Sequence, residues 1–340
     1  MLQNVAKVTL AYVSDQTPGI TRRRSGKGFS YRTPEGGLVR DRQTLARIRA
    51  LAIPPAYEHV WICVDPDGHL QAPGREARGR KQYRYHPGWS EVRGKAKFDS
   101  LAEFGAALPL IREQVDADLR RRGLPQERVL ASVVWLLQQT LIRIGNDTYA
   151  RDNKSYGLTT LRQRHVQLDA GKIRLRFKGK SGKQWNLQFV DRRIVGVLRS
   201  MQELPGQHLF QYVDDDGTCR TVSSDDVNLY LRATTGAEFT SKHFRTWAGT
   251  VVAATLLGKT ELPQTKAATA RVLNAAVDLV AARLGNTRAV CRSAYIHPRI
   301  VEDWLEGKLA AALERAARSR SGSPEGLDAD EALVLRWLTT

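Results

Sequence analysis

The chain has 340 residues, of which 42% are hydrophobic, and its formal net charge is +18. This length favours two domains or more, and the hydrophobic content supports a buried core and argues against a disordered chain. The positive charge predicts a polyanionic partner, with nucleic acid as the first choice and an anionic membrane surface as the second. A basic protein whose charge only aids solubility is the alternative.

A membrane or secreted protein is not indicated. No stretch of the sequence reaches the roughly 20 apolar residues that span a bilayer, and Met1–Lys7 lacks the pattern of a secretory signal. Cys63, Cys219 and Cys291 are far apart and odd in number, so they indicate neither a disulfide framework nor a zinc site. We therefore expect a cytoplasmic protein.

The first 97 residues are expected to form a small β-rich domain with one helix, Asp41–Leu51. The domain is basic, with 18 Lys and Arg against 8 Asp and Glu. Its predicted strands are three short apolar or alternating runs: Leu38–Val39, Val60–Val64 and His69–Ala72. Asp65–Gly68 is a strong turn signal between the last two runs.

From Phe98 to the C-terminus the hydrophobic period is mostly that of helices. The predicted helices are Leu101–Arg122, Gln126–Ile144, Asp191–Gln202, Ser224–Thr235, Ser241–Leu257, Ala267–Leu284, Pro298–Ala317 and Ala329–Leu338. A small antiparallel sheet is predicted from strands at 166–168, 172–177 and 184–190, with a basic tip at Lys178–Lys183. The predicted fold class is α+β: a β-rich domain at 1–97, then a mostly α-helical domain at 98–340.

The common nucleotide and metal signatures are absent from the sequence. Gly258-Lys259-Thr260 looks like the end of a phosphate-binding loop, but Ala253 stands where that loop needs its first glycine. Asp214–Gly217 lies between two strand-like runs and is expected to be a hairpin turn, not a metal site. The sequence predicts no metal, no nucleotide and no other cofactor. Chemistry on a phosphate would therefore depend on fixed cations.

Five positions carry residue types that suit such chemistry: Arg143, Lys180, Arg245, Asn286 and Tyr295. Taken singly, each has an ordinary structural explanation, such as a helix cap for Asn286 or a solvated hairpin for Lys180. Together, two arginines can clamp phosphate oxygens, a lysine can act as general acid and a tyrosine can act as nucleophile.

The strings around these positions resemble those of the bacterial, poxvirus-like type IB DNA topoisomerases, and the resemblance covers nearly the whole chain. The matching strings are Ile53–Tyr57, Gly79–Tyr85, Ile142–Asn146, Ser155–Leu161, Phe177–Lys180, Lys242–Trp247 and Arg292–Pro298. No single string is decisive, but their order and spacing together are highly specific.

The resemblance implies a catalytic domain of the tyrosine recombinase and type IB topoisomerase kind. It also implies relaxation of supercoiled duplex DNA without ATP or metal, by a monomer. Tyr295 would form a 3′-phosphotyrosyl link, Arg143 and Arg245 would hold the phosphate oxygens, and Lys180 would protonate the leaving 5′ oxygen. Lys242 matches a lysine near the leaving group and is the second candidate for this acid.

The resemblance also implies where DNA is held, and a location at the nucleoid. Gln82, Tyr83 and Tyr85 match residues that approach bases in the major groove, where glutamine can read adenine. Tyr149 and Thr160 match positions that touch backbone phosphates. For the segment around Tyr83, a β-strand with ordinary aromatic packing is the alternative.

Asn286 departs from the pattern of the poxvirus enzymes, which carry histidine nine residues before the nucleophile. Asparagine can donate a hydrogen bond to a phosphate oxygen, but it cannot carry charge or shuttle a proton. We therefore expect Asn286 to serve as a neutral hydrogen-bond donor.

Two other functions stay open at this stage. A tyrosine recombinase shares the two arginines, the hairpin lysine and the tyrosine, but it usually begins with a helical DNA-binding domain and not a β-rich one. A DNA-binding protein that has lost its activity is the other alternative, and the complete set of catalytic residue types argues against it.

Overall fold

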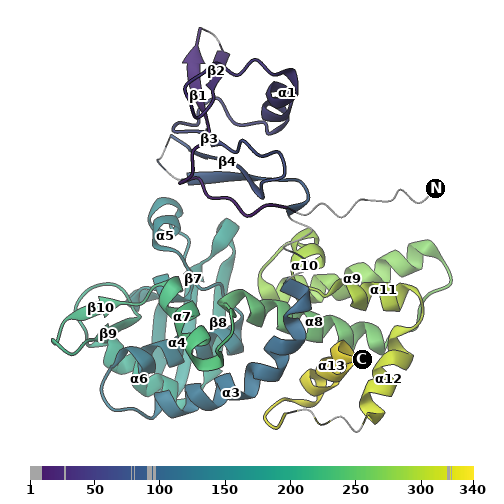
Figure 1. Ribbon diagram of the computed structural model, residues 1–340. Helices are drawn as coiled ribbons and strands as arrows, with labels where there is room; N and C mark the ends of the chain where they lie inside the picture. The colour runs from purple at the N-terminus through teal and green to yellow at the C-terminus, as the bar shows by residue number, and fades with distance from the viewer. Residues whose placement is uncertain are drawn as a thin grey trace. The chain divides into compact units, whose positions relative to one another are not determined.

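The computed structural model describes residues 10–340 except 27, 78, 80, 90–93, 95, 96, 320, 321 and 323. Met1–Lys7, and Arg80 within the Gly79–Tyr85 string, lie outside the described residues. The chain folds as two compact units, residues 1–97 and residues 98–340 (Figure 1).

The N-terminal unit is built on two small antiparallel sheets, and helix α1 follows the first hairpin. Its elements are β1 (Ile20–Ser25), β2 (Gly28–Arg32), α1 (Arg42–Ala50), β3 (Trp61–Ile62), β4 (Leu70–Arg75) and β5 (Lys81–Tyr85). The sheet orders are β2-β1-β3 and β4-β5. Helix α1 begins where the Asp41 carboxylate accepts a hydrogen bond from the Thr44 amide at 2.7 Å. Ile20, Ile48 and Ile62 lie in the core of this unit.

The sequence prediction for this unit was partly wrong. The strand predicted at Leu38–Val39 is only an isolated bridge between Arg32 and Leu38. β1 and β2 were not predicted, because β1 has the polar sequence ITRRRS and most of its side chains are not buried. Pairing along the whole length of the two strands, from Thr21↔Arg32 to Ser25↔Gly28, holds this hairpin where no apolar alternation indicates it.

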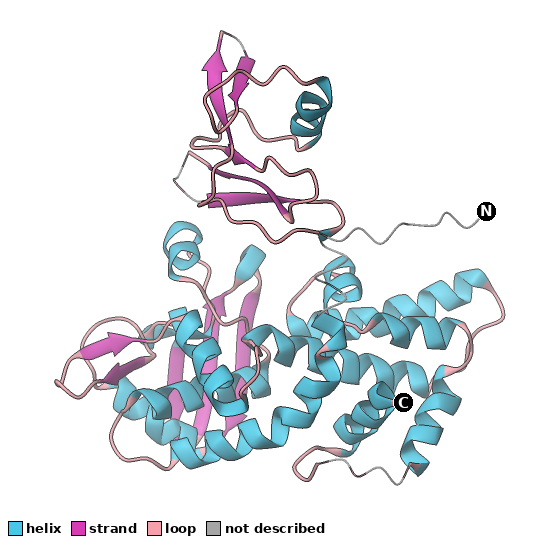
Figure 2. Ribbon diagram, in the orientation of Figure 1, coloured by secondary structure: helices cyan, strands magenta, loops and turns pink. Residues whose placement is uncertain are grey.

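The C-terminal unit is mostly helical, with one three-stranded sheet and one short hairpin (Figure 2). Its helices are α3 (Leu101–Leu119), α4 (Gln126–Thr140), α5 (Asp147–Asn153), α6 (Arg192–Gln202), α7 (Ser224–Thr235), α8 (Ser241–Gly258), α9 (Lys266–Leu284), α10 (Arg288–Ala294), α11 (Pro298–Leu305), α12 (Leu309–Arg318) and α13 (Ala329–Thr339). Its strands are β6 (Val166–Asp169), β7 (Lys172–Lys178), β8 (Gln184–Val190), β9 (Gln211–Val213) and β10 (Cys219–Thr221). Within the part of the chain that the structure describes, no helix combines the length and the apolar character needed to cross a bilayer.

The three-stranded sheet has the order β6-β7-β8 and the two-residue period expected of a half-buried sheet. Ile173, Leu175 and Phe177 on β7 are buried in the core, and the residues between them are exposed. The hairpin from β7 to β8 pairs without a break from Lys172↔Val190 to Lys178↔Gln184. Its turn therefore projects from a rigid support.

Two predicted helices were too long. Helix α4 ends at Thr140 and not at Ile144, because Leu141 adopts a left-handed conformation with φ of 54°. The helix predicted at Pro298–Ala317 is two helices, α11 and α12, separated near Gly307, which has φ of 69°. Apolar spacing continues through both breaks, so periodicity alone does not show them. The seven-residue helices α5 and α10 were not predicted.

Candidate active site

A cavity of about 350 Å³ in the C-terminal unit collects residues from distant parts of the chain. Six of its lining residues were predicted from the sequence as catalytic or DNA-contacting: Arg143, Tyr149, Lys180, Lys242, Arg245 and Tyr295. Four of the six are cations, so the cavity is suited to an anionic group such as a phosphate. Among the described residues, no group of three or more His, Cys, Asp or Glu side chains is placed to hold a metal ion.

Arg245 lies in the first turns of α8 and is only 3% exposed. Its guanidinium donates one hydrogen bond to the carbonyl oxygen of Leu141 and another, 2.7 Å long, to that of Leu284. These carbonyls terminate α4 and α9, and helix C-termini carry partial negative charge that stabilises a cation. Burial lowers the pKa of Arg245, and the nearby Tyr295 opposes this shift. The side chain is thus a buried charge held by two helix ends.

Arg143 is held at the same end of α9. It follows the left-handed Leu141 after α4, and it donates to the carbonyl oxygen of Gly285 at 3.4 Å and to Oδ1 of Asn286. Because both arginines depend on the C-terminus of α9, that helix end positions two positive charges beside one cavity.

Asn286 has a geometry that differs from the one the sequence led us to expect. Its Oδ1 accepts from Arg143, and its buried Nδ2 has no hydrogen-bond partner among the described residues. Asn286 does not belong to the lining of the cavity. Its Oδ1 therefore orients Arg143, a role that the sequence did not predict, and donation from Asn286 to a phosphate oxygen stays a prediction.

Tyr295 occupies the short break between α10 and α11. Its amide caps α10 by donating to the Cys291 carbonyl at 3.0 Å, and α11 then begins with Pro298 as its first residue. The Tyr295 ring lies against Arg245, whose Cζ is 5.1 Å from the ring centroid. A Cβ atom at Gly249 of α8 would lie 2.4 Å from the Tyr295 carbonyl oxygen. A glycine is thus needed there for the segment around Tyr295, the predicted nucleophile segment, to approach α8.

Lys180 is exposed at the turn between β7 and β8 and reaches the cavity from there. The turn is tight, since Ser181 has φ of 58° and the Gly179 amide donates to the Lys183 carbonyl at 2.7 Å. Trp185 fixes the hairpin from inside, and a Cβ at Gly179 or at Gly285 would lie 2.6 Å from its ring. This one indole therefore packs between the lysine turn and the end of α9.

Thr160, another predicted DNA contact in the C-terminal unit, does not line this cavity. Thr160 is buried, and its hydroxyl exchanges hydrogen bonds with the amide and carbonyl of Gly157 at 2.9 and 3.1 Å. It lines a separate cavity of about 280 Å³ together with Arg151 and Arg162. Its contact with a backbone phosphate stays a prediction.

Gln82, Tyr83 and Tyr85 belong to β5 in the N-terminal unit. Tyr83 and Tyr85 are 45% and 40% exposed, and their rings stack with centroids 6.0 Å apart. Two neighbouring aromatic rings on the surface of a basic unit fit a contact with DNA, which also stays a prediction.

Several residues of the cavity wall were not predicted as site residues, and Asn146 is the most informative of them. Its Oδ1 accepts from the Tyr149 amide at 2.9 Å and so begins α5, which carries Tyr149 to the cavity. An asparagine directly before Asp147 is the available signal, because it is a preferred helix N-cap. Ser155 and Tyr156, which belong to the matching string Ser155–Leu161, also line the cavity, as does Ser241, which directly precedes the string Lys242–Trp247.

A tyrosine that shares a cavity with several cations suits one class of site, in which a phosphoryl group is transferred to a tyrosine oxygen. The comparisons with known proteins agree with this class. The profile described as "Eukaryotic DNA topoisomerase I, catalytic core" matches residues 86–319, and that described as "Bacterial DNA topoisomerase IB, N-terminal domain" matches residues 28–76. The chain belongs to the type IB DNA topoisomerase family.

Individual relatives are also named DNA topoisomerases. The chain is 33% identical over 285 residues to the "DNA topoisomerase 1B" of Acanthamoeba polyphaga mimivirus, over 82% of this chain and 85% of that protein. It is 21% identical over 253 residues to the "DNA topoisomerase 1B" of vaccinia virus (strain Copenhagen), over 72% of this chain and 75% of that protein. These similarities extend across most of the chain, so DNA is the substrate.

Proposed function

We propose that this type IB topoisomerase relaxes supercoiled duplex DNA with Tyr295 as its nucleophile and with no metal or nucleotide. One observation carries the assignment of residues: Arg143, Lys180 and Arg245 line the same cavity as Tyr295, although they come from four separate segments of the chain. Fixed positive charges at these positions supply the electrostatic stabilisation that a metal supplies in other phosphoryl-transfer enzymes.

In the cleavage step, the Tyr295 hydroxyl loses its proton to water while its oxygen attacks the scissile phosphorus and forms the phosphotyrosyl bond at the 3′ end. The bond from phosphorus to the 5′ oxygen of the next deoxyribose breaks. Arg143 and Arg245 neutralise the negative charge that grows on the non-bridging oxygens. Both guanidiniums are already fixed by helix ends, so little reorganisation accompanies the reaction.

Lys180 donates the proton that the leaving 5′ oxygen needs. It is mounted on the turn of a hairpin, where it lines the cavity but is not buried. Lys242, in the first turn of α8, lines the same cavity and is the second candidate. Religation reverses these steps, with the Tyr295 phenolate as the leaving group beside Arg245. The bond energy stays in the phosphotyrosyl link, so ATP is not needed.

DNA would be held by the many positive side chains of both units, which gives a salt-sensitive and largely sequence-independent grip. Gln82, Tyr83 and Tyr85 would approach base edges, and Tyr149, Thr160 and Lys242 would contact the backbone near the cleavage site. We expect the enzyme to act as a monomer, to prefer supercoiled DNA, and to work in the cytoplasm at the nucleoid.

The test is incubation of the purified protein with supercoiled plasmid in EDTA, without ATP. We expect a ladder of relaxed topoisomers on an agarose gel. A strict requirement for magnesium in DNA cleavage would contradict the proposal, whereas modest stimulation would not, since magnesium screens phosphates and speeds product release.

The catalytic residues alone would also suit a tyrosine recombinase. A recombinase would join paired sites, so a plasmid that carries two such sites would give DNA products of changed size. The match of residues 28–76 to a bacterial topoisomerase IB N-terminal domain favours the topoisomerase.

A further inference from the structure

The C-terminal helix α13 packs against α3, α8 and α12. It begins at Ala329, beyond residues 86–319 that match the catalytic core of the family. Two of its side chains, Glu331 and Trp337, are buried and make polar contacts with other helices. One contact reaches the helix of Arg245, and the other reaches the helix that follows Tyr295.

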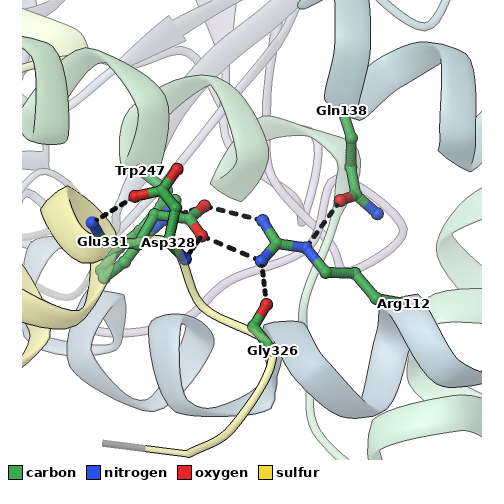
Figure 3. Close-up of polar contacts among 6 residues, drawn as sticks. All are labelled: Arg112, Gln138, Trp247, Gly326, Asp328 and Glu331. Atoms are coloured by element: carbon green, nitrogen blue, oxygen red, sulfur yellow. Dashed lines mark hydrogen bonds and ion pairs between the residues drawn. The ribbon is translucent and has the colours of Figure 1, made fainter.

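Glu331 joins α13 to α3 and α8 (Figure 3). It is 8% exposed, and its carboxylate accepts two hydrogen bonds from Arg112 of α3, at 2.7 and 2.9 Å. It also accepts one at 3.2 Å from the indole Nε1 of Trp247 on α8. Arg112 is fixed in turn by Gln138 of α4 at 3.1 Å and by the Gly326 carbonyl at 2.6 Å. Burial would raise the pKa of Glu331, but the bonds from Arg112, the Asp328 amide and Trp247 outweigh it and lower the pKa.

Trp247 is the residue through which α13 acts on the site. It follows Arg245 by two positions, so the two side chains leave α8 about 200° apart around the helix axis. Arg245 lines the cavity that also contains Tyr295, and Trp247 is anchored on the opposite side of α8 by Glu331. A Cβ at Gly105 of α3 would lie 2.4 Å from the Trp247 ring, so the indole is enclosed closely. Rotation of α8 would have to break this contact.

Trp337 makes the second connection, to α11. Its Nε1 donates to the Asp303 carboxylate at 3.3 Å, and the guanidinium of Arg299 stacks over its ring at 4.5 Å. Its ring also meets that of His297 edge-on, with centroids 5.8 Å apart. His297 stands two residues after Tyr295, and its amide donates to Thr250 of α8 at 3.1 Å. The nucleophile segment is thus bound to α13 as well as to α8.

We propose that α13 is a brace that sets the position of Arg245 relative to Tyr295, with Glu331, Trp247 and Trp337 as positioning residues. The inference rests on the catalytic roles proposed above for Arg245 and Tyr295. A shift of α8 against the nucleophile segment would misplace the guanidinium that must meet the phosphate. A misplacement of about 1 Å can slow a reaction about a hundredfold.

The test compares two tryptophans that lose the same group. Trp247→Phe removes the indole N–H that Glu331 accepts. Trp304→Phe removes an equivalent N–H, which donates to the Thr260 carbonyl at 3.0 Å, and Trp304 is also 3% exposed. Trp304 contacts neither Glu331 nor Trp337 through that group, so it is the matched control. Single-turnover formation of the covalent adduct at saturating DNA, DNA affinity and thermal stability are measured for each.

We expect Trp247→Phe to slow adduct formation by between about tenfold and about a hundredfold, with DNA affinity nearly unchanged. Trp304→Phe should lose comparable stability but cleave at nearly the parent rate. Trp337→Phe, at the other end of α13, should also cleave slowly. It replaces Trp247→Phe as the test variant if Trp247→Phe folds poorly. Equal cleavage rates for Trp247→Phe, Trp337→Phe and Trp304→Phe would overturn the brace. If the parent itself forms no adduct, the proposed function has failed, and the brace fails with it.

Discussion

The buried guanidinium of Arg245 shows how single residues are prepared for chemistry in this protein. A charged side chain that is almost fully buried is costly unless it is hydrogen-bonded, and here the carbonyls of Leu141 and Leu284 accept from the two terminal nitrogens of the guanidinium. The guanidinium of Arg143 likewise donates to the Gly285 carbonyl and to Oδ1 of Asn286. The positive charges are therefore in place before any phosphate arrives, which is the condition for electrostatic catalysis.

The role of Lys180 can be separated from that of Arg143 with a modified substrate. If sulfur replaces the bridging 5′ oxygen, a thiolate leaves, and it needs no proton. Lys180→Ala should then be very slow on the normal oxygen substrate but nearly normal on the sulfur one, in single-turnover cleavage assays. Arg143→Ala loses charge stabilisation, so it should stay slow on both. An equal defect of Lys180→Ala on both substrates would mean that Lys242 or water is the acid.

Asn286 gives a second prediction at this scale. Because the Asn286 Oδ1 accepts from Arg143, Asn286→Ala should leave the guanidinium poorly oriented. We expect cleavage to slow by roughly 10²-fold, the low end of the range for removing one hydrogen-bond donor to the transition state. Asn286→His should keep substantial activity, since a neutral imidazole nitrogen can also accept from an arginine. Cleavage rates at saturating DNA would test both variants. An alanine variant as fast as the parent would remove Asn286 from the site.

Among the junctions between secondary-structure elements, the C-terminus of α9 places the tightest steric limit on its residue. Gly285 caps α9 in a left-handed conformation with φ of 60°, and a Cβ there would lie 2.6 Å from the Trp185 ring. Trp185 supports the hairpin of Lys180, so this glycine joins the arginine end of the site to the lysine turn.

Gly285→Ala should therefore lower stability and also slow cleavage. Gly236→Ala is its control, because Gly236 caps α7 in a similar conformation, with φ of 69°, and a Cβ there would have nothing within 4 Å. Gly236→Ala should lower the free energy of unfolding only by the strain of an alanine in the left-handed conformation, about 1–2 kcal/mol. It should leave the cleavage rate unchanged. Denaturant unfolding and adduct formation measure the two effects. Equal losses of stability in the two variants would show that the contact with Trp185 is unimportant.

A pH dependence belongs to the junction between α10 and α11. Burial, and then the charge of Arg299, lowers the pKa of His297 to about 4, while Asp99 and Asp303 oppose the shift. The imidazole is near 6.5 when unfolded, so its contribution to stability is fully present above about pH 6.5. That contribution is lost as the pH falls toward 4. His165 behaves alike, with its pKa lowered to about 4 by burial and by Arg164 and Arg162.

We expect the free energy of unfolding to decrease between pH 6.5 and pH 4. His297→Asn should make the decrease shallower by about one proton, because asparagine does not titrate. Asparagine can still cap α11 as the His297 Nδ1 does, by accepting from the Arg299 amide at 3.2 Å in the parent. Urea unfolding at several pH values measures the slope. A slope identical in parent and variant would contradict the shifted pKa.

At the scale of the whole molecule, the sequence predicted the helical C-terminal unit and its sheet because their apolar periods are regular. It did not predict β1, whose polar side chains give no alternation, or the ends of helices set by Leu141 and Gly307. The catalytic positions came from the matching strings and not from periodicity. What no string could give is the set of backbone carbonyls around Arg245, or the acceptor role of Asn286, because these depend on helix ends meeting in space.

Every catalytic role proposed for this protein depends on Tyr295 as the residue that forms the covalent bond to DNA. The most direct measurement is to quench a cleavage reaction with denaturant, digest the covalent complex with protease and nuclease, and identify the nucleotide-bearing peptide by mass spectrometry. We expect a nucleotide on Tyr295 and no adduct from Tyr295→Phe, which should still bind DNA. A nucleotide on another residue, or an adduct that persists in Tyr295→Phe, would contradict it.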